Sequence, residues 1–356
     1  QTLTSPLTST GTQSGPTGFN MGFGNRYYVR TRYTSAYPAG TTSSWSPTST
    51  FKTAAFVDYY WLSVLGGYYA DYAGQIAVNS TNQYIPTIYT TGWSNSATAN
   101  DNDAYLTKFN SMGDLQWKRR FRSSNGYHDK GHGVATDSSD NVYMCGESSS
   151  EAFLVKYNGS GVLQWQRGIS GTGDMRLKSA KTDSSGNVYV VGQAHGDFLI
   201  AKYDSYGNML WNRTFDNVDI NSSTGSYGND MALDDSGNIY ITGNAYVATG
   251  AGTAAGDPRE GRREEFGIFT MKFDSSGNIV WQRRIRVHKK HNYGNGITVD
   301  SSGAVYVTGR VSATRTNGDD LLVARYNNAG SLSWYTTIEG PSNVTGAAVV
   351  VDGSGD

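Results

Sequence analysis

Two short sequence blocks alternate along most of the chain, and this repetition constrains the fold more than any other feature. The first block reads TDSSDNVYMCG at 136–146, TDSSGNVYVVG at 182–192, LDDSGNIYITG at 233–243 and VDSSGAVYVTG at 299–309. The second block ends in tryptophan, as in FLVKYNGSGVLQW at 153–165. Its five tryptophans lie at 117, 165, 211, 281 and 334, which gives spacings from 46 to 70 residues. A unit of about 46 residues with insertions is typical of propellers and solenoids.

Each block has the local chemistry of a β-hairpin. An alternating apolar run leads into a polar turn that starts with Asp or Asn and contains Gly, and a β-branched and aromatic run follows. Asp can cap its own turn through the side chain, and Gly adopts a positive φ at no steric cost. Two hairpins per repeat predict four antiparallel strands, which make one propeller blade. Because no block has the 3.6-residue apolar period of a helix, we predict an all-β propeller.

The repeat positions predict five full blades and part of another. The full blades are expected at about 74–121, 131–169, 178–215, 229–285 and 295–338. A further copy of the first strand begins at Gly346, and residues 59–67 around Trp61 are typical of a lone fourth strand. Unpaired strand edges are a liability, so we expect a propeller over 54–356 that is incomplete at its C-terminus and has six or seven blades when complete.

The front of the chain has a different pattern. Residues 1–17 have the Ser, Thr, Gly and Pro composition of a linker or an incomplete N-terminal segment. Residues 18–53 hold two strand-like runs, RYYVRTRYTS at 26–35 and SSWSPTSTFKT at 43–53. Two strands alone bury too little to form a domain. The stretch 18–53 resembles the last two strands of a fibronectin type III domain, which implies that it is the C-terminal part of such a domain.

The repeats themselves resemble a β-propeller repeat family whose units read D-x-x-G-N-x-Y-x-x-G and then G-x-x-x-W. The resemblance covers roughly residues 59–356. This family occurs in bacterial secreted and surface proteins and in virion proteins of tailed phages. Together with the fibronectin-like hairpin, it implies a non-enzymatic virion protein of the tail, fibre or baseplate. Its expected partners are other virion proteins, further copies of itself, or a host-surface glycan. A bacterial cell-surface or secreted adhesion protein is the alternative.

The repeated tryptophans are predicted to be structural. In four of the five repeats an Arg follows the Trp two residues later, and residues i and i+2 of a strand share a face. We expect inter-blade packing in which the stem of the Arg covers the indole, and the same architectural role for the basic residue of each third strand. The tryptophans assigned to the repeat are Trp61, Trp117, Trp165, Trp211, Trp281 and Trp334.

Blade geometry also predicts which face of the propeller carries function. Because strands alternate in direction, the tight Asp and Gly turns fall on one face and the long connections fall on the other. We expect the face with the long connections to bind ligand. Basic side chains there could attract an anionic envelope polysaccharide or an acidic subunit, and the histidines could bind a metal instead. We predict no metal site. The candidate ligand-binding residues are His128, His132, His288, Lys289, Lys290 and His291.

Composition and motif content narrow the remaining functions. A net charge of −1 provides no basic surface for binding nucleic acid. The sequence contains no run of 18 apolar residues, so we predict no membrane insertion. The single Cys145 excludes an intrachain disulfide.

No nucleophile elbow, zinc motif, P-loop or dinucleotide fingerprint is present, so we expect no enzyme and no cofactor. A quinone-dependent enzyme, or a carbohydrate-active enzyme with paired carboxylates, is a further alternative. The carboxylates considered are Asp174, Asp216, Asp219, Asp230 and Glu339. Calcium in the DSSGN turns is weighed against simple turn capping.

Overall fold

The computed structural model divides into two units, residues 1–62 and residues 63–356. It describes residues 26–29, 49–52, 71–79, 86–95, 102–123, 128–149, 151–170, 174–215, 226–248, 264–285, 292–312, 318–339 and 343–352. In the first unit, β1 (Arg26–Val29) pairs antiparallel with β2 (Ser49–Lys52). The expected pairing of these runs is therefore present, whereas the fibronectin resemblance remains a prediction. The expected linker at 1–17 and the lone strand around Trp61 lie outside the described residues.

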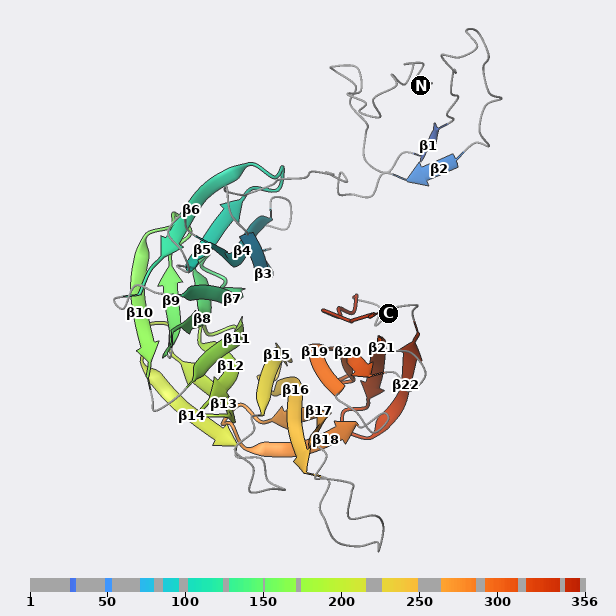
Figure 1. Ribbon diagram of the computed structural model, residues 1–356. Helices are drawn as coiled ribbons and strands as arrows, with labels where there is room; N and C mark the ends of the chain where they lie inside the picture. The colour runs from blue at the N-terminus through green and yellow to red at the C-terminus, as the bar shows by residue number, and fades with distance from the viewer. Residues whose placement is uncertain are drawn as a thin grey trace, which may run out of the picture. The chain divides into compact units, whose positions relative to one another are not determined.

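The second unit contains five four-stranded antiparallel sheets in its described part, each made of strands that follow one another in sequence (Figure 1). Blade 1 consists of β3 (Asp71–Asn79), β4 (Thr87–Asn95), β5 (Asn102–Phe109) and β6 (Leu115–Phe121). Blade 2 consists of β7 (Asp129–Thr136), β8 (Val142–Ser148), β9 (Glu151–Tyr157) and β10 (Leu163–Ile169). Blade 3 consists of β11 (Met175–Thr182), β12 (Val188–Ala194), β13 (Asp197–Tyr203) and β14 (Met209–Phe215). Blade 4 consists of β15 (Tyr227–Leu233), β16 (Ile239–Ala248), β17 (Glu264–Phe273) and β18 (Ile279–Ile285). Blade 5 consists of β19 (Asn292–Val299), β20 (Val305–Ser312), β21 (Asp319–Tyr326) and β22 (Leu332–Ile338).

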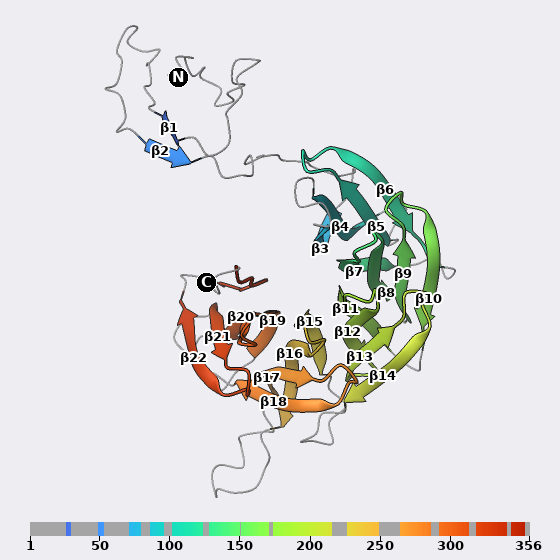
Figure 2. The same ribbon diagram turned by 180° about the vertical axis from the view of Figure 1, so that it is seen from behind.

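The five blades follow one another around a common axis, which confirms the propeller prediction (Figures 1 and 2). The first strand of each blade lies on the inner side and the fourth strand on the outer side. Successive inner strands lie against one another, as β3 does with β7 and β7 does with β11. All elements that the structure describes are strands. Accordingly, the described chain offers no helix with the length and apolar character of a membrane span.

Residues 343–352 lie against the inner side of blade 5. Gly346 N donates to Gly309 O at 3.2 Å, and Asn295 Nδ2 donates to Gly346 O at 2.9 Å. A bond equivalent to that of Asn295 joins blades 4 and 5, where Asn229 Nδ2 donates to Gly294 O at 2.8 Å. This segment thus makes the contact that the first strand of a following blade makes elsewhere. The total number of blades remains a prediction.

The tight turns form because Asp satisfies the backbone of its own loop. In the turn of blade 3, Asp183 Oδ1 accepts hydrogen bonds from Ser185 N at 3.0 Å and Asn187 N at 2.9 Å, while Gly186 adopts φ +77°. The capping interpretation therefore accounts for the Asp in this repeat. The described residues contain no group of three or more His, Cys, Asp or Glu side chains suited to holding a metal ion.

In the outer strands of blades 1, 2 and 4, the Trp–Arg pair packs against the next blade, as expected. Trp165 Nε1 donates to Ser205 O at 3.0 Å, and Arg167 Nε donates to Gly207 O at 2.7 Å. The Arg167 guanidinium carbon lies 5.3 Å from the indole centroid. Gly207 has φ +81° and lies under Trp165, so a Cβ there would come within 2.8 Å of the ring. Glycine at this position thus serves both the turn and the neighbouring indole. Equivalent bonds join Trp117 and Arg119 to blade 2, and Trp281 and Arg283 to blade 5.

The basic residues of the third strands are also architectural. Lys156 Nζ lies 5.0 Å from the ring of Tyr143, whose hydroxyl donates to Asp137 Oδ2 at 3.1 Å. In blade 2 an Asp, Asp140, replaces the turn glycine and adopts φ 60°. Its carboxylate accepts from Lys108 Nζ of blade 1 at 2.7 Å. The repeated charges are therefore used within and between blades.

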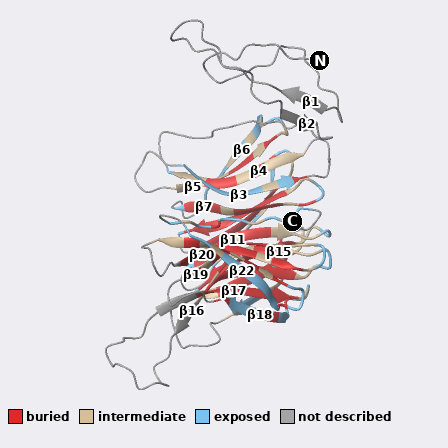
Figure 3. Cartoon of the chain, turned by 90° about the vertical axis from the view of Figure 1, so that its right-hand side faces the viewer, coloured by how far each residue is buried: buried red, intermediate tan, exposed pale blue. Residues whose placement is uncertain are grey.

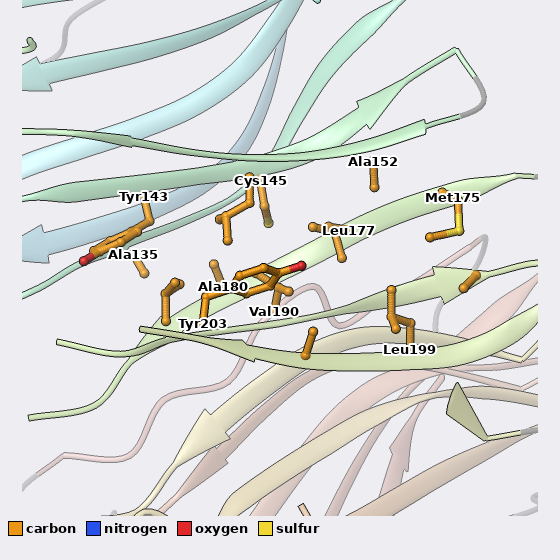
Figure 4. Packing of buried hydrophobic residues seen from close by; sticks show 14 residues of the cluster. Ala135, Tyr143, Cys145, Ala152, Met175, Leu177, Ala180, Val190, Leu199 and Tyr203 are labelled. Carbon is orange, nitrogen blue, oxygen red and sulfur yellow. The ribbon is translucent and has the colours of Figure 1, made fainter. Parts of the chain in front are cut away.

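The hydrophobic core lies between neighbouring blades rather than at a single centre. Figure 4 shows the cluster between blades 2 and 3, where Tyr143 and Cys145 from β8 face Leu177 from β11 and Val190 from β12. Burial raises the pKa of the Cys145 thiol to about 12, so the thiol stays protonated at neutral pH. Buried residues are concentrated in the inner three strands of blades 2 to 5 and in β4 and β5 of blade 1, whereas β3 and the outer strands are mostly exposed (Figure 3).

Candidate functional site

Seven side chains of blades 1, 2 and 3 meet on the side of the long connections. The first strands begin and the second strands end on this side, so these segments bring residues of three blades together. We call this group the blade 1–3 cluster. It consists of Tyr72 from β3, Trp93 from β4, Lys130 and His132 from β7, Glu147 from β8, and Arg176 and Lys178 from β11.

An aromatic platform forms one end of the cluster. Tyr72 and Trp93 face each other across the β3–β4 ladder, and their rings stack with centroids 5.0 Å apart and an interplanar angle of 13°. Such cross-strand aromatic pairs stabilise a sheet and hold both rings in place. Tyr72 is 51% exposed, so its outer surface is open to solvent. The edge of His132 in blade 2 continues the row, with its ring centroid 5.3 Å from that of Trp93.

Glu147 holds the charged part of the cluster together. Its Oε1 accepts from Lys130 Nζ at 2.8 Å, and its Oε2 lies 3.1 Å from Arg176 Nε and 3.6 Å from His132 Nε2. Burial alone raises the pKa of Glu147, but His132, Lys130 and Lys178 outweigh it and hold this pKa well below its usual range. The carboxylate is therefore ionised at neutral pH.

His132 and Lys178 share one contact across the boundary between blades 2 and 3. Lys178 Nζ lies 3.2 Å from His132 Nε2. Burial lowers the pKa of His132, and burial also lowers the pKa of Lys178. A neutral imidazole can accept a hydrogen bond from an ammonium, so we assign Nε2 as the unprotonated nitrogen that accepts from Lys178. Glu147 Oε2, at 3.6 Å, lies beyond hydrogen-bond distance of this nitrogen.

β-Bulges place His132 and Lys178 in this contact. The β7–β8 register shifts between Gly131 and Gly133, and the β11–β12 register shifts between Leu177 and Ser179. A bulge adds one residue to its strand and re-aims the side chain there. Both residues lie five positions before the turn Asp of their repeat, Asp137 and Asp183 respectively. Comparison of this repeat position could have identified Lys178 from the sequence.

The structure supports only part of the set of candidate ligand-binding residues. His132 lies within the cluster, whereas His128 is an exposed residue with φ 59° just before β7. His288, Lys289, Lys290 and His291 lie outside the described residues. Sequence reasoning missed the other six members of the cluster. Tyr72, Trp93 and Glu147 fall in strands whose alternation predicts only a half-buried ladder, so they gave no functional signal.

The carboxylates considered for catalysis occupy separate positions. Asp230 lies on the inner strand β15, where it accepts from Ser179 Oγ of blade 3 at 2.8 Å and from Ile297 N of blade 5 at 3.2 Å. Burial raises the pKa of Asp230. Asp174 pairs with Arg176, and Glu339 follows the outer strand β22. Asp216 and Asp219 lie outside the described residues. Among the carboxylates that are described, the structure shows no contact between two of these candidates.

Comparisons with known proteins agree with the propeller fold. The model of a family described as a β-propeller repeat, SBBP, matches residues 116–153. No curated protein matches the sequence. The chain is a β-propeller protein built from repeats. The resemblance to phage proteins stated from the sequence is not shown by these comparisons and remains a prediction.

Several solved structures are similar at low identity. The β-propeller domain of the Trilobed protease from Pyrococcus furiosus is 8% identical with a TM-score of 0.39, over 75% of this chain and 70% of that one. XC5397 from Xanthomonas campestris, named a gluconolactonase, is 11% identical with a TM-score of 0.38, over 77% of this chain and 79% of that one. A luciferin-regenerating enzyme is 14% identical with a TM-score of 0.40, over 77% and 80% of the two chains.

These structures correct the expectation that the protein is not an enzyme. Two of the similar propellers are enzymes by name, so the lack of a catalytic motif was not a sound reason to exclude catalysis. The physical reason lies in the architecture: residues that meet at one end of a propeller come from different blades, as in the blade 1–3 cluster, and leave no contiguous motif in the sequence. At 11 and 14% identity the likeness is one of fold alone and assigns no activity to this chain.

Proposed function

We propose that the protein is a recognition propeller that binds an oligosaccharide through the blade 1–3 cluster. The observation that carries this proposal is the exposed ring of Tyr72, held in place by its stack on Trp93 and next to charged side chains. The C–H face of a sugar ring packs on an aromatic ring, and a few fixed polar groups orient its hydroxyls. A rigid platform also loses little conformational entropy when the ligand binds.

The source of this ligand depends on whether the chain belongs to a phage particle or to a bacterial surface. On a tailed-phage particle, the expected ligand is a glycan of the host surface, and contacts with other virion proteins or with further copies of the chain would position the propeller. On a bacterial surface protein, the same face would serve adhesion. Mass spectrometry of purified phage particles and of cell-surface fractions separates these two settings, because only one of them should contain the chain.

Binding to a panel of neutral and acidic bacterial surface oligosaccharides tests the proposal. Tyr72→Ala should weaken binding about tenfold or more, since it removes the platform, and tenfold corresponds to about 1.4 kcal/mol. Tyr335→Ala is a matched control, because Tyr335 is also 51% exposed but lies on the outer strand β22. Equal affinity of the two variants for every bound oligosaccharide would contradict the proposal.

The same panel should be followed for shorter products. Retention of intact oligosaccharide fits recognition alone. Release of products that depends on Tyr72 would add a reaction to the proposed binding site.

A further inference from the structure

We infer that the bound oligosaccharide carries an anionic group, a carboxylate or a sulfate, and that Lys178 is the residue that receives it. This inference rests on the proposed function and names the ligand class. It assigns a recognition role to a lysine that the sequence did not single out as a candidate.

The charges of the cluster do not balance. Lys130, Arg176 and Lys178 provide three cations, while Glu147 and the neighbouring Asp174, which is not itself part of the cluster, provide two carboxylates. Glu147 forms ion pairs with Lys130 and Arg176, and the Asp174 carboxylate lies 3.3 Å from Arg176 Nη2. With His132 neutral, the cluster and Asp174 together carry one positive charge in excess. An anionic group of a ligand would neutralise this excess.

Lys130 and Arg176 have carboxylate partners, so Lys178 is the cation that accounts for the excess charge. Its ammonium contacts the uncharged His132, and in the described part of the chain no carboxylate oxygen lies within 4.0 Å of it. The side chain is partly buried, and a cation with little solvent is costly unless an anion pairs with it. A charge-assisted hydrogen bond from a ligand carboxylate or sulfate would supply that anion. Arg176 and Lys130, whose side chains are 43% and 31% exposed, lie on the solvent side of the cluster.

The rings of Trp93 and His132 connect the exposed ring of Tyr72 to Lys178. Ring contacts of 5.0 Å from Tyr72 to Trp93 and 5.3 Å from Trp93 to His132 lie between the platform and the lysine. We therefore expect the stacked ring and the anionic group to belong to different residues of one oligosaccharide.

Three tetrasaccharides of related backbone test the inference by calorimetric titration: neutral chitotetraose, hyaluronan with carboxylates only, and carboxyl-reduced chondroitin sulfate with sulfates only. The wild type should bind at least one anionic probe about tenfold more tightly than chitotetraose. Which anionic probe gains affinity identifies carboxylate or sulfate as the recognised group. Lys178→Met should remove most of this preference. Replacement of a partly buried cation by an apolar side chain of similar length is compatible with folding, which urea unfolding would verify.

Lys118→Met is the matched control, because Lys118 is exposed on the outer strand β6, where it lies over Tyr105. This variant should keep the preference. If all three probes bind with equal affinity and Tyr72→Ala weakens the binding of each, the proposed oligosaccharide site at Tyr72 is supported and the inference about Lys178 is wrong. If the preference persists in Lys178→Met, the anionic group binds elsewhere and the inference is wrong. Failure of the folded wild type to bind any probe would count against both the inference and the proposed function.

Discussion

Lys178 Nζ of blade 3 lies 3.2 Å from His132 Nε2 of blade 2, and this contact couples a cation to an imidazole whose pKa burial lowers below its usual value of 6.5. The contact requires an unprotonated Nε2, because a protonated imidazole has no acceptor. Protonation of His132 would set two cations against each other and leave the ring to pair with Glu147 Oε2, which lies 3.6 Å away. The protonation state of one histidine thus decides how the blade boundary is held.

The free energy of unfolding should fall as the pH decreases from about 7.5 to 5.5. Burial lowers the pKa of His132 in the folded state, so its contribution is present above the unfolded value of 6.5 and is lost as pH falls. Glu147 adds a loss in the same direction at lower pH, below its unfolded value of 4.5. His132→Gln should flatten the dependence between 7.5 and 5.5, as urea unfolding at each pH would show. An unchanged slope in this variant would mean that His132 is not the titrating group.

Trp165→Phe should lower the free energy of unfolding by about 1–2 kcal/mol, because it removes the hydrogen bond to Ser205 O and part of the buried ring. Trp334→Phe is the control at the same repeat position, where the indole is 45% exposed. It should change stability by less than about 0.5 kcal/mol. Equal losses in urea titrations would show that the inter-blade bond contributes nothing of its own.

Gly207→Ala should destabilise more than Gly186→Ala, although both glycines have a positive φ close to +80°. The shared backbone cost is about 1–2 kcal/mol for each. Only at Gly207 would the new Cβ meet the indole of Trp165 at 2.8 Å, whereas at Gly186 the nearest atom is Ser205 Cβ at 3.8 Å. The difference, about 1–3 kcal/mol, measures overpacking at the blade boundary by thermal or urea unfolding. Equal losses of stability in the two variants would show that Trp165 does not lie against residue 207 in solution.

Chelation should leave the melting temperature unchanged. The turn carboxylates already accept backbone hydrogen bonds, as Asp183 Oδ1 does from Ser185 N and Asn187 N. An excess of EDTA during thermal unfolding checks this expectation. A drop of several degrees that calcium reverses would revive the alternative of calcium in the DSSGN turns.

The blades could be predicted from the sequence because their determinants are local. The turn Asp and the αL glycine act within a few residues of each other, as Asp183 and Gly186 do. The repeated Trp acts across the blade boundary, as Trp165 does on Gly207. Repetition then made each signal visible several times. The architectural role of Lys156 and its equivalents followed for the same reason.

The candidate site could not be predicted in the same way, because it is assembled from single residues of three blades. Tyr72 and Trp93 are ordinary strand residues until the β3–β4 register sets one ring on the other. His132 was found because it lies close to a long connection on the face expected to bind ligand, whereas Lys178 lies within a strand and comes beside it through the bulge in β11. The expected group of histidines and lysines at 288–291 lies outside the described residues, so its role stays a prediction.

Hydrogen–deuterium exchange with a bound oligosaccharide from the panel tests the location of the binding site most directly. The account predicts slower exchange in peptides that cover the starts of β3, β7 and β11 and the end of β4, which carry the blade 1–3 cluster. Slower exchange confined to the tight turns on the opposite face, such as 183–187 and 204–208, or to the outer strands, would contradict it.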